Sequence, residues 1–396
     1  MRIGMVLDKK FPTDTRVENE AIALVEAGHN VSLLCVAYNK NEPQKENYKE
    51  IELYKVYRSD KANKRARGLI NTIADYNTVY WAKKIKKFVI EENIKVLHIH
   101  DLFMFGAAIK ANKKLNITLV GDTHENYVSG LMQYRFSTTF PGNLLISTKK
   151  WRKKEREWIS KLDYAVTVID EMKDRISEYI DKERIVVYPN VASNDLSKQD
   201  IDPSILERFK DKFVIQYVGA IDLHRGVDIV IKALPFLVKK IENIHFIIIG
   251  DGSTVGKLKK LASELDVQNY ITFEGRVPEN KIPSYCKASQ IGLIPHLKSE
   301  QTDNSCPNKI FSYMAMGLPI ITNDCKSLAR LVTETKTGLV YKADAPIDLA
   351  KKVIELYRSP NTRKEMGISG KIAAGNKYNY AHQVQSLVGF YNKLSQ

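Results

Sequence analysis

The chain has 396 residues, of which 44% are hydrophobic and 27% charged, so its composition is that of a globular protein with two or three domains. A disordered chain, a collagen and a low-complexity scaffold are therefore excluded. No apolar run approaches the roughly 18 to 20 residues that cross a bilayer. The N-terminal stretch becomes charged at Asp8, so we expect no signal peptide.

The net charge is +15, from 61 Lys and Arg residues against 46 Asp and Glu residues. Residues 51–150 carry much of it, with 17 basic and 8 acidic residues. Such a field attracts anions, whether a nucleic acid, an acidic membrane surface or a phosphorylated ligand. A solvated lysine-rich surface is the alternative explanation. Four cysteines (Cys35, Cys286, Cys306 and Cys325) have no metal-ligand spacing, so we interpret them as reduced thiols of a cytoplasmic protein.

Short apolar segments alternate with amphipathic helical stretches along the first half of the chain. Their Val, Ile and Leu runs lack strict alternation, as in parallel strands buried on both faces. A helix at about 16–28 separates the first two strands. The expected strands are 2–8, 30–37, 96–101, 117–123, 164–169 and 185–190.

The pattern begins again after a polar stretch at 191–210, which we interpret as a linker. We therefore predict an α/β protein with two doubly wound, Rossmann-like domains facing a central cleft, at 1–195 and 196–382. A C-terminal helix at 383–396 is expected to pack back on the first domain. Functional residues should follow the strands, because such sheets bind ligands at the carboxyl ends of their strands. The second series of strands is expected at 213–220, 245–250, 271–275, 291–295, 318–323 and 338–342.

Two stretches of the second half predict anion binding. Arg225 and Gly226 precede a helix that begins near Val227, where a guanidinium is placed to hold a phosphate. In 299–324, Ser305 is the expected N-cap of a short helix, its amides from Ser305 to Asn308 are free, and Lys309 adds a positive charge. The alternatives are a surface arginine and an ordinary capped helix with a solvated lysine.

Two stretches of the first half are candidates for ligand contacts. His124 follows the strand 117–123, where a neutral imidazole can hydrogen-bond a substrate hydroxyl, although a structural histidine is the alternative. We interpret His98 and His100 as structural and expect no metal site, because no convincing carboxylate or thiolate set accompanies them. The loop before Arg16 lacks the glycines of a dinucleotide-binding motif, yet Arg16 is placed to contact a ligand across the cleft.

The order and spacing of these motifs resemble the retaining glycosyltransferases of family 4, which have the GT-B fold. The similarity rests on 11–34, 98–101 and 121–127 in the first half. In the second half it rests on 217–234, 246–253, 271–278, 307–324 and 337–340. The resemblance implies a nucleotide-sugar donor, UDP- or GDP-linked, held mainly by the second domain, and an acceptor held mainly by the first. It also implies that the enzyme needs no metal or other cofactor.

The resemblance assigns residues to this chemistry. Arg225 and Lys309 match the cations that clamp the donor diphosphate, and His124 matches a histidine that lines the donor sugar. Asn304 and Ser312 occupy the positions of two family glutamates, so both carboxylates are absent here. We expect His124, Arg225 and Lys309 to be catalytic. The expected donor-binding residues are Arg16, Gly219, Arg276, Val277, Asp303, Asn304, Ser305, Asn308 and Ser312.

The family also gives the basic region a more specific meaning, because many relatives extend saccharides on lipid carriers or cell-wall polymers. Trp151 and Trp158 near the basic run 149–156 suggest peripheral attachment to an anionic inner membrane face. Two other functions stay open: a sugar-nucleotide epimerase of the same fold, and a sugar-nucleotide-binding protein impaired in catalysis. Nucleic-acid binding rests on charge alone, without a supporting motif, and is not expected.

Overall fold

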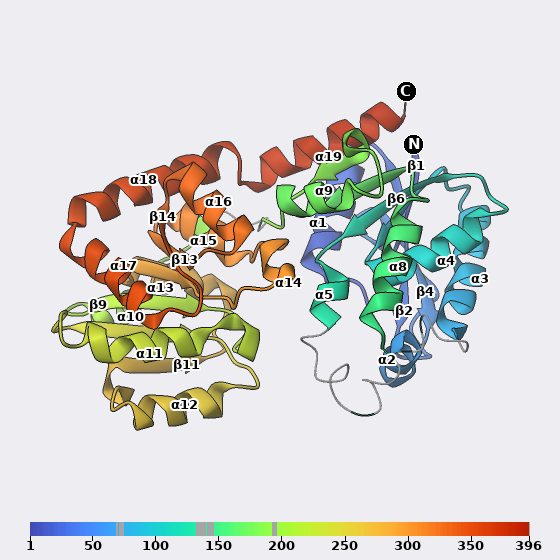
Figure 1. The fold of residues 1–396 in the computed structure, drawn as a ribbon. Coiled ribbons are helices and arrows are strands. Elements are labelled where there is room, and N and C mark those ends of the chain that lie inside the picture. The colour runs from blue at the N-terminus through green and yellow to red at the C-terminus, as the bar shows by residue number, and fades with distance from the viewer. Residues whose placement is uncertain (69, 71–74, 132–139, 141–145, 192–195, 396) are drawn as a thin grey trace. The chain divides into compact units, whose positions relative to one another are not determined.

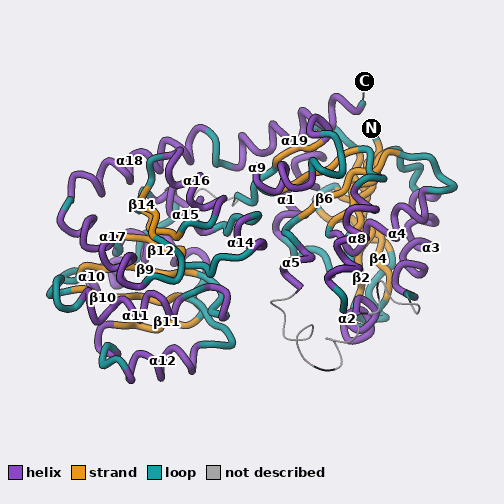
Figure 2. The backbone as a smooth tube through the Cα atoms, viewed as in Figure 1, coloured by secondary structure: helices purple, strands orange, loops and turns teal. Residues whose placement is uncertain are grey.

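The computed structural model describes residues 1–68, 70, 75–131, 140, 146–191 and 196–395. The chain divides into two compact units (Figures 1 and 2), Met1–Pro189 with Gln383–Gln396, and Asn190–His382. We call them the first and second domain. The division after Pro189 precedes the boundary expected at residue 195, which lies outside the described residues.

The first domain is built on an eight-stranded sheet in the order β3-β4-β2-β1-β5-β6-β7-β8. The chain adds β2 on one side of β1 and then returns to add β5 on the other side, so the switch point lies between β1 and β5. The strands are β1 (Arg2–Val6), β2 (Asn30–Ala37), β3 (Lys45–Tyr48), β4 (Ile51–Tyr57), β5 (Val96–His100), β6 (Thr118–Thr123), β7 (Tyr164–Thr167) and β8 (Ile185–Val187). The helices are α1 (Thr15–Glu26), α2 (Asp60–Gly68), α3 (Tyr76–Glu91), α4 (Leu102–Asn112), α5 (Tyr127–Leu131), α8 (Thr148–Ile159) and α9 (Asp170–Ile176), with a 3₁₀ turn η1 (Lys182–Arg184).

The hairpin of β3 and β4 was not expected from the sequence. It makes the first sheet mixed, because β3 pairs antiparallel to β4 while β4 pairs parallel to β2. Its turn places Lys49 and Glu50 at φ angles of 48° and 64°, a left-handed conformation that usually selects Gly, Asn or Asp. The turn therefore carries none of the sequence signals of a hairpin.

The second domain is built on a six-stranded parallel sheet in the order β11-β10-β9-β12-β13-β14. Its switch point lies between β9 and β12, and all six residues of β10 are buried, as expected for a central parallel strand. The strands are β9 (Phe213–Val218), β10 (Ile244–Ile249), β11 (Ile271–Gly275), β12 (Ile291–Ile294), β13 (Ile320–Asn323) and β14 (Gly338–Tyr341). The helices are α10 (Pro203–Phe209), α11 (Val227–Leu237), α12 (Val255–Glu264), α13 (Ile282–Ala288), α14 (Glu300–Asp303), α15 (Lys309–Met316), α16 (Lys326–Thr335), α17 (Pro346–Arg358) and α18 (Pro360–Asn376). The 3₁₀ turns are η2 (Leu196–Lys198), η3 (Leu223–Arg225), η4 (Gln268–Tyr270) and η5 (Glu279–Lys281).

The surface of α8 differs from the expectation for a membrane-binding helix. Trp151 and Trp158 are only 3% and 6% exposed, and their rings pack edge to face at 6.0 Å. The expectation that they supply an apolar element at the surface is therefore wrong, because the apolar face of α8 is buried in the first domain. The exposed residues of this helix are all cationic: Lys149, Lys150, Arg152, Lys153 and Arg156. Among the described residues, no helix is long and apolar enough to cross a membrane.

The last helix, α19 (Tyr380–Leu394), belongs to the first domain from Gln383 onward. Leu387 and Tyr391 are fully buried in the core that also contains Ile3, Leu24 and Val120. The Tyr391 hydroxyl also lies 2.6 Å from Nδ1 of His98 on β5. The end of the chain is therefore part of the core of the first domain.

Because Leu387 is fully buried, the Leu387→Ala variant should lose about 2–5 kcal/mol of stability of the first domain. All three tryptophans of the chain, Trp81, Trp151 and Trp158, lie in that domain, so tryptophan fluorescence during urea unfolding reports on it. The exposed Ser386→Ala variant is the control. Equal unfolding midpoints for the two variants would contradict the packing of α19 in this core.

Candidate functional site

The second domain has a pocket of about 420 Å³ at the carboxyl end of β9, next to the switch point of its sheet. Its walls come from the loop after β9, from η3 and η5, and from the first residues of α15. It is lined by Leu196, Val218, Gly219, Ala220, Arg225, Glu279, Ile282, Pro307, Asn308, Lys309 and Ser312.

Gly219 lets the chain turn sharply at the mouth of this pocket. Its φ angle is 133°, a value that residues with a side chain rarely adopt. A Cβ atom at this position would lie 3.0 Å from Nζ of Lys309. The backbone conformation therefore favours glycine, and a side chain here would also displace the end of the Lys309 side chain.

The Nζ atom of the half-buried Lys309 is itself buried, and no carboxylate of the described residues lies beside it. The same atom lies 3.5 Å from the centre of the Tyr217 ring, and it has no hydrogen-bond partner among the described residues. Burial, together with the positive charge of Arg225, lowers the pKa of Lys309 well below its usual range. A negative charge bound in this pocket would relieve both effects.

Arg225 is the second cation of the pocket. One guanidinium nitrogen, Nη1, lies 3.5 Å from Nε2 of His296, while the buried Nε has no partner in the described part of the chain. Burial and the charges of Lys309 and Arg225 lower the pKa of His296 well below its usual range, so this imidazole is neutral. Within the described residues, no carboxylate lies within 4.0 Å of the charged nitrogens of Arg225 or Lys309. Two like charges in one pocket, neither of them in an ion pair with a described residue, indicate an anion site.

Helix α15 begins later than expected. It starts at Lys309, directly after Asn308, so the expectation that Ser305 caps it is wrong. The Ser305 carbonyl accepts a hydrogen bond from the Ser327 hydroxyl. The amides of Ile310 and Phe311 bond to the preceding turn. In the described structure, the amides of Asn308 and Lys309 donate to no protein acceptor, so these two remain for a ligand.

Of the expected donor-binding residues in the second domain, Gly219, Asn308 and Ser312 line the pocket together with Arg225 and Lys309. The others do not. Arg276 is 85% exposed at the side chain and Val277 packs against the hydrophobic cluster of Ile205 and Phe209.

Asp303, Asn304 and Ser305 stabilise their own loop. The Asp303 carboxylate accepts from the amide of Lys326 at 2.8 Å, and the Asn304 side chain donates to the carbonyl of Glu300 at 2.8 Å. The same stretch contains the short helix α14, whose first turn has a capping box of Ser299 and Thr302.

Three residues in or beside the pocket were not predicted from the sequence: His296, Tyr217 and Glu279. His296 follows β12 at the switch point, so the rule that functional residues follow the strands could have found it. Tyr217 lies inside β9, and its contact with Lys309 depends on the three-dimensional fold.

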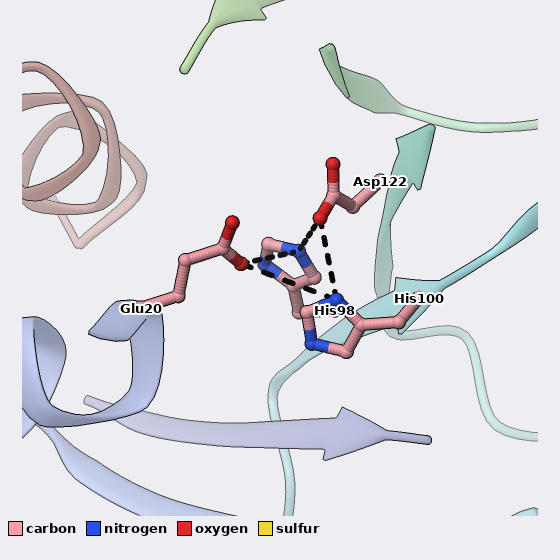
Figure 3. Close-up of side chains that lie close together, drawn as sticks. All are labelled: Glu20, His98, His100 and Asp122. Atoms are coloured by element: carbon pink, nitrogen blue, oxygen red, sulfur yellow. Dashed lines mark hydrogen bonds and ion pairs between the residues drawn. The ribbon is translucent and has the colours of Figure 1, made fainter. Parts of the chain in front are cut away.

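The first domain contains a buried cluster of polar residues from three elements (Figure 3). Glu20 comes from α1, His98 and His100 from β5, and Asp122 from β6, and none is exposed. Nε2 of His98 lies 3.4 Å from Glu20 Oε2, and Nδ1 of His100 lies 3.3 Å from Asp122 Oδ2. Burial and the neighbouring His98 lower the pKa of His100 to about 3, so it is neutral.

Glu20 and Asp122 lie beside His98 and His100, so the expectation that no carboxylate set accompanies these histidines is wrong. These four side chains could hold a metal ion by residue type and spacing. However, the Arg16 guanidinium lies 3.0 Å from Glu20 Oε1 and 2.8 Å from Asp122 Oδ1. Arg16 thus supplies a positive charge to both carboxylates.

Arg16 lies inside the first domain. It is 3% exposed, contacts Asp122 and Glu20, and donates to the Tyr188 carbonyl at 2.6 Å. Its guanidinium is therefore committed to the protein and is not presented to a ligand.

His124 lies at the edge of this cluster, with 14% of its side chain exposed. Nε2 lies 2.7 Å from Asp122 Oδ2, and Nδ1 lies 3.5 Å from Asp101 Oδ1. Burial disfavours the imidazolium, but the carboxylates of Asp122 and Asp101 outweigh it and raise the pKa of His124 to about 9. The expectation of a neutral imidazole is therefore wrong, because His124 is a cation at neutral pH.

Comparison with known proteins agrees with this architecture. The family described as Glycosyltransferase Family 4 matches residues 13–193, and the one described as Glycosyl transferases group 1 matches residues 198–372. An uncharacterized glycosyltransferase of Methanocaldococcus jannaschii is 27% identical over 237 residues, 59% of each chain. Alpha-D-kanosaminyltransferase of Streptomyces kanamyceticus is 24% identical over 338 residues, 83% of this chain and 84% of its own. The crystal structure of Anabaena HepE in complex with UDP is similar in fold, with a TM-score of 0.73 and 12% identity, over 99% of this chain and 100% of that one.

The fold and the family matches define a glycosyltransferase. The chain belongs to the glycosyltransferases of family 4, with the GT-B fold of two Rossmann-like domains.

The uncompensated charge of Lys309 should make the free protein less stable. The Lys309→Met variant keeps the side-chain volume and should raise the free energy of unfolding by about 1–3 kcal/mol at neutral pH. This gain in stability should shrink as the pH rises toward 10.5, the ordinary pKa of lysine. Folding lowers the pKa of Lys309, so the lysine costs the wild type stability only while it is protonated in the unfolded state. The free energy of unfolding of each variant is measured by urea unfolding followed by circular dichroism. Lys232→Met, which removes an exposed lysine paired with Asp228, is the matched control. A destabilised Lys309→Met protein would contradict this account.

Proposed function

We propose that the chain is a retaining, metal-independent glycosyltransferase. It moves a sugar from a nucleoside-diphosphate donor, UDP- or GDP-linked, to a saccharide, lipid-linked or cell-wall acceptor. The observation that supports the proposal most is the pair of unneutralised cations, Arg225 and Lys309, in one pocket of the second domain. UDP is supported as the nucleotide by the solved complex of Anabaena HepE with UDP.

The proposed chemistry uses these charges on the leaving group. As the bond between sugar and diphosphate breaks, negative charge grows on the diphosphate oxygens. The Arg225 guanidinium, the Lys309 ammonium and the amides of Asn308 and Lys309 would stabilise this charge without reorganising. Loss of one such donor typically lowers the rate about 10²–10³-fold.

Retention follows if the acceptor attacks from the side of the departing diphosphate. In this route a leaving phosphate oxygen takes the acceptor proton, so no carboxylate base is required. Among the described residues of the pocket lining, Glu279 is the one carboxylate. We assign His124, as an imidazolium, to a hydrogen bond with the donor sugar.

Donor binding is tested by calorimetric titration of UDP, GDP, ADP and CDP with EDTA present. We expect one nucleotide to bind, and the Arg225→Ala variant to lower its affinity at least about tenfold, since charged hydrogen bonds contribute about 1.5–3 kcal/mol. Arg208→Ala, which removes an exposed arginine paired with Glu274 in the same domain, should bind normally. Equal affinities of the wild type and Arg225→Ala would contradict the proposed site.

An assay with the sugar-linked form of the nucleotide that binds distinguishes the alternative functions. An epimerase would convert the sugar nucleotide without any acceptor, and an impaired binding protein would leave it unchanged with every acceptor. A retaining transferase gives a product whose anomeric configuration, seen by NMR, equals that of the donor.

We also propose that the first domain attaches to an anionic membrane surface by charge alone, since the tryptophans of α8 are buried. Each lysine near such a surface contributes about 1 kcal/mol. Reversing two exposed lysines in the Lys149→Glu/Lys153→Glu variant should thus weaken sedimentation with phosphatidylglycerol vesicles at least about tenfold at low salt. Lys257→Glu/Lys260→Glu changes the net charge equally, on two exposed residues of the second domain. Negligible binding of the wild type at low salt, or equal loss in both variants, would contradict this proposal.

A further inference from the structure

The buried cluster of the first domain brings four atoms of metal-binding type together (Figure 3). They are Oε2 of Glu20, Nε2 of His98, Nδ1 of His100 and Oδ2 of Asp122, from α1, β5 and β6. The four distances from a nitrogen to an oxygen of this set are 3.3, 3.4, 3.7 and 4.0 Å. One ligand atom of each residue lies within 4.8 Å of the other three. The four side chains therefore surround a single point.

A tetrahedral zinc ion needs ligand atoms at nearly this spacing. Bonds from zinc to imidazole nitrogen and carboxylate oxygen are about 2.0–2.2 Å long, so two ligand atoms of the tetrahedron lie about 3.3–3.6 Å apart. The longest of the four distances, 4.0 Å, would shorten by only about half an ångström or less around such an ion. Two imidazoles and two carboxylates are also ligands that zinc accepts.

The burial of Glu20 and His98 is not explained by hydrogen bonds. Both residues are 0% exposed. Both carboxylate oxygens of Glu20 and Nε2 of His98 lack a hydrogen-bond partner in the described part of the chain. Buried polar atoms without a partner call for a bound water or ion. Oε2 of Glu20 and Nε2 of His98 lie 3.4 Å apart, so one ion bound to both would satisfy them.

The residues around the four ligands would hold them in place. Nδ1 of His98 lies 2.6 Å from the Tyr391 hydroxyl, which leaves Nε2 as the nitrogen for a metal. Arg16 Nε lies 3.0 Å from Glu20 Oε1, and Arg16 Nη2 lies 2.8 Å from Asp122 Oδ1. These two oxygens are outside the set of four, so the guanidinium can orient both carboxylates while their other oxygens bind the ion.

Two groups compete with a metal for Asp122 Oδ2. His124 Nε2 lies 2.7 Å from this oxygen, and Arg16 Nε lies 3.0 Å from it. A carboxylate oxygen has two lone pairs, so one of these contacts can remain beside a metal bond. The contact of Arg16 is the one that can lengthen, because the guanidinium keeps Asp122 Oδ1 and Glu20 Oε1.

We propose that Glu20, His98, His100 and Asp122 bind one structural zinc ion that joins α1 to β5 and β6. Because none of the four is exposed, the ion binds as the domain folds and exchanges slowly afterwards. The site belongs to the first domain and no step of the proposed sugar transfer uses it. The inference therefore does not depend on the proposed function.

The test measures the zinc content of the full chain, produced in cells grown with added Zn²⁺. A brief EDTA treatment removes loosely bound metal before elemental mass spectrometry. We expect about one zinc ion per wild-type chain, and at least about tenfold less in Glu20→Gln, which keeps the shape of the side chain but removes its charge. His245→Gln is the matched control, because it removes a buried histidine of the second domain that bonds to Thr272, and it should keep the zinc.

X-ray absorption spectroscopy of the wild type identifies the ligands, and it decides the question even if Glu20→Gln fails to fold. The spectrum should show nitrogen and oxygen ligands at about 2.0–2.2 Å and no sulfur. Sulfur ligands at about 2.3 Å would place the ion at cysteines and overturn the proposal. Fewer than about one zinc ion per ten wild-type chains, or equal zinc in the wild type and folded Glu20→Gln, would overturn it as well. Absence of nucleotide binding would count against the proposed function alone.

Discussion

Two positive charges held in one pocket without a partner are expensive for a folded protein. Burial and mutual repulsion disfavour the ammonium of Lys309. Among the described residues, the hydrogen-bond partner of the Arg225 guanidinium is the neutral imidazole of His296. A protein keeps such an arrangement when a ligand supplies the missing negative charge. The glycine at 219 and the open amides before α15 belong to the same arrangement, since both bring the backbone close to the place where that charge would lie.

The topology of the sheets explains why the polar side chains gather where they do. In the second domain the switch point between β9 and β12 brings Gly219 and His296 to one edge of the sheet. In the first domain the switch point between β1 and β5 brings together Asp8, Asp101 and, from the next strand, Asp122. The charges at the two switch points differ. Asp8, Asp101 and Asp122 of the first domain are each paired with a cation, whereas Arg225 and Lys309 of the second domain have no carboxylate partner among the described residues.

The sequence predicted the parallel strands closely, because runs such as His245–Ile249 are too apolar for anything but a buried position. It also singled out Arg225 and Lys309, which both line the pocket of the second domain. It missed the hairpin of β3 and β4, whose turn is formed by Lys49 and Glu50 in place of the usual turn residues. It also missed α14, because four residues are too few to show helical periodicity.

The contacts of single charged side chains were less predictable. Arg16 lies on an amphipathic helix, and nothing in its local sequence shows that Asp122, 106 positions later, lies beside it. The charge state of His124 depends on how closely the carboxylates of Asp122 and Asp101 approach its ring in the folded chain, which the sequence does not show. Arg276 follows a strand, as a ligand-binding residue would, but its side chain is exposed outside the pocket.

The central claim is that a diphosphate binds between Arg225 and Lys309, and a crystal structure of the protein with UDP tests it most directly. The account predicts phosphate oxygens within hydrogen-bond distance of Lys309 Nζ, the Arg225 guanidinium and the amides of Asn308 and Lys309. A diphosphate bound elsewhere, with both side chains positioned as they are in the free protein, would contradict it.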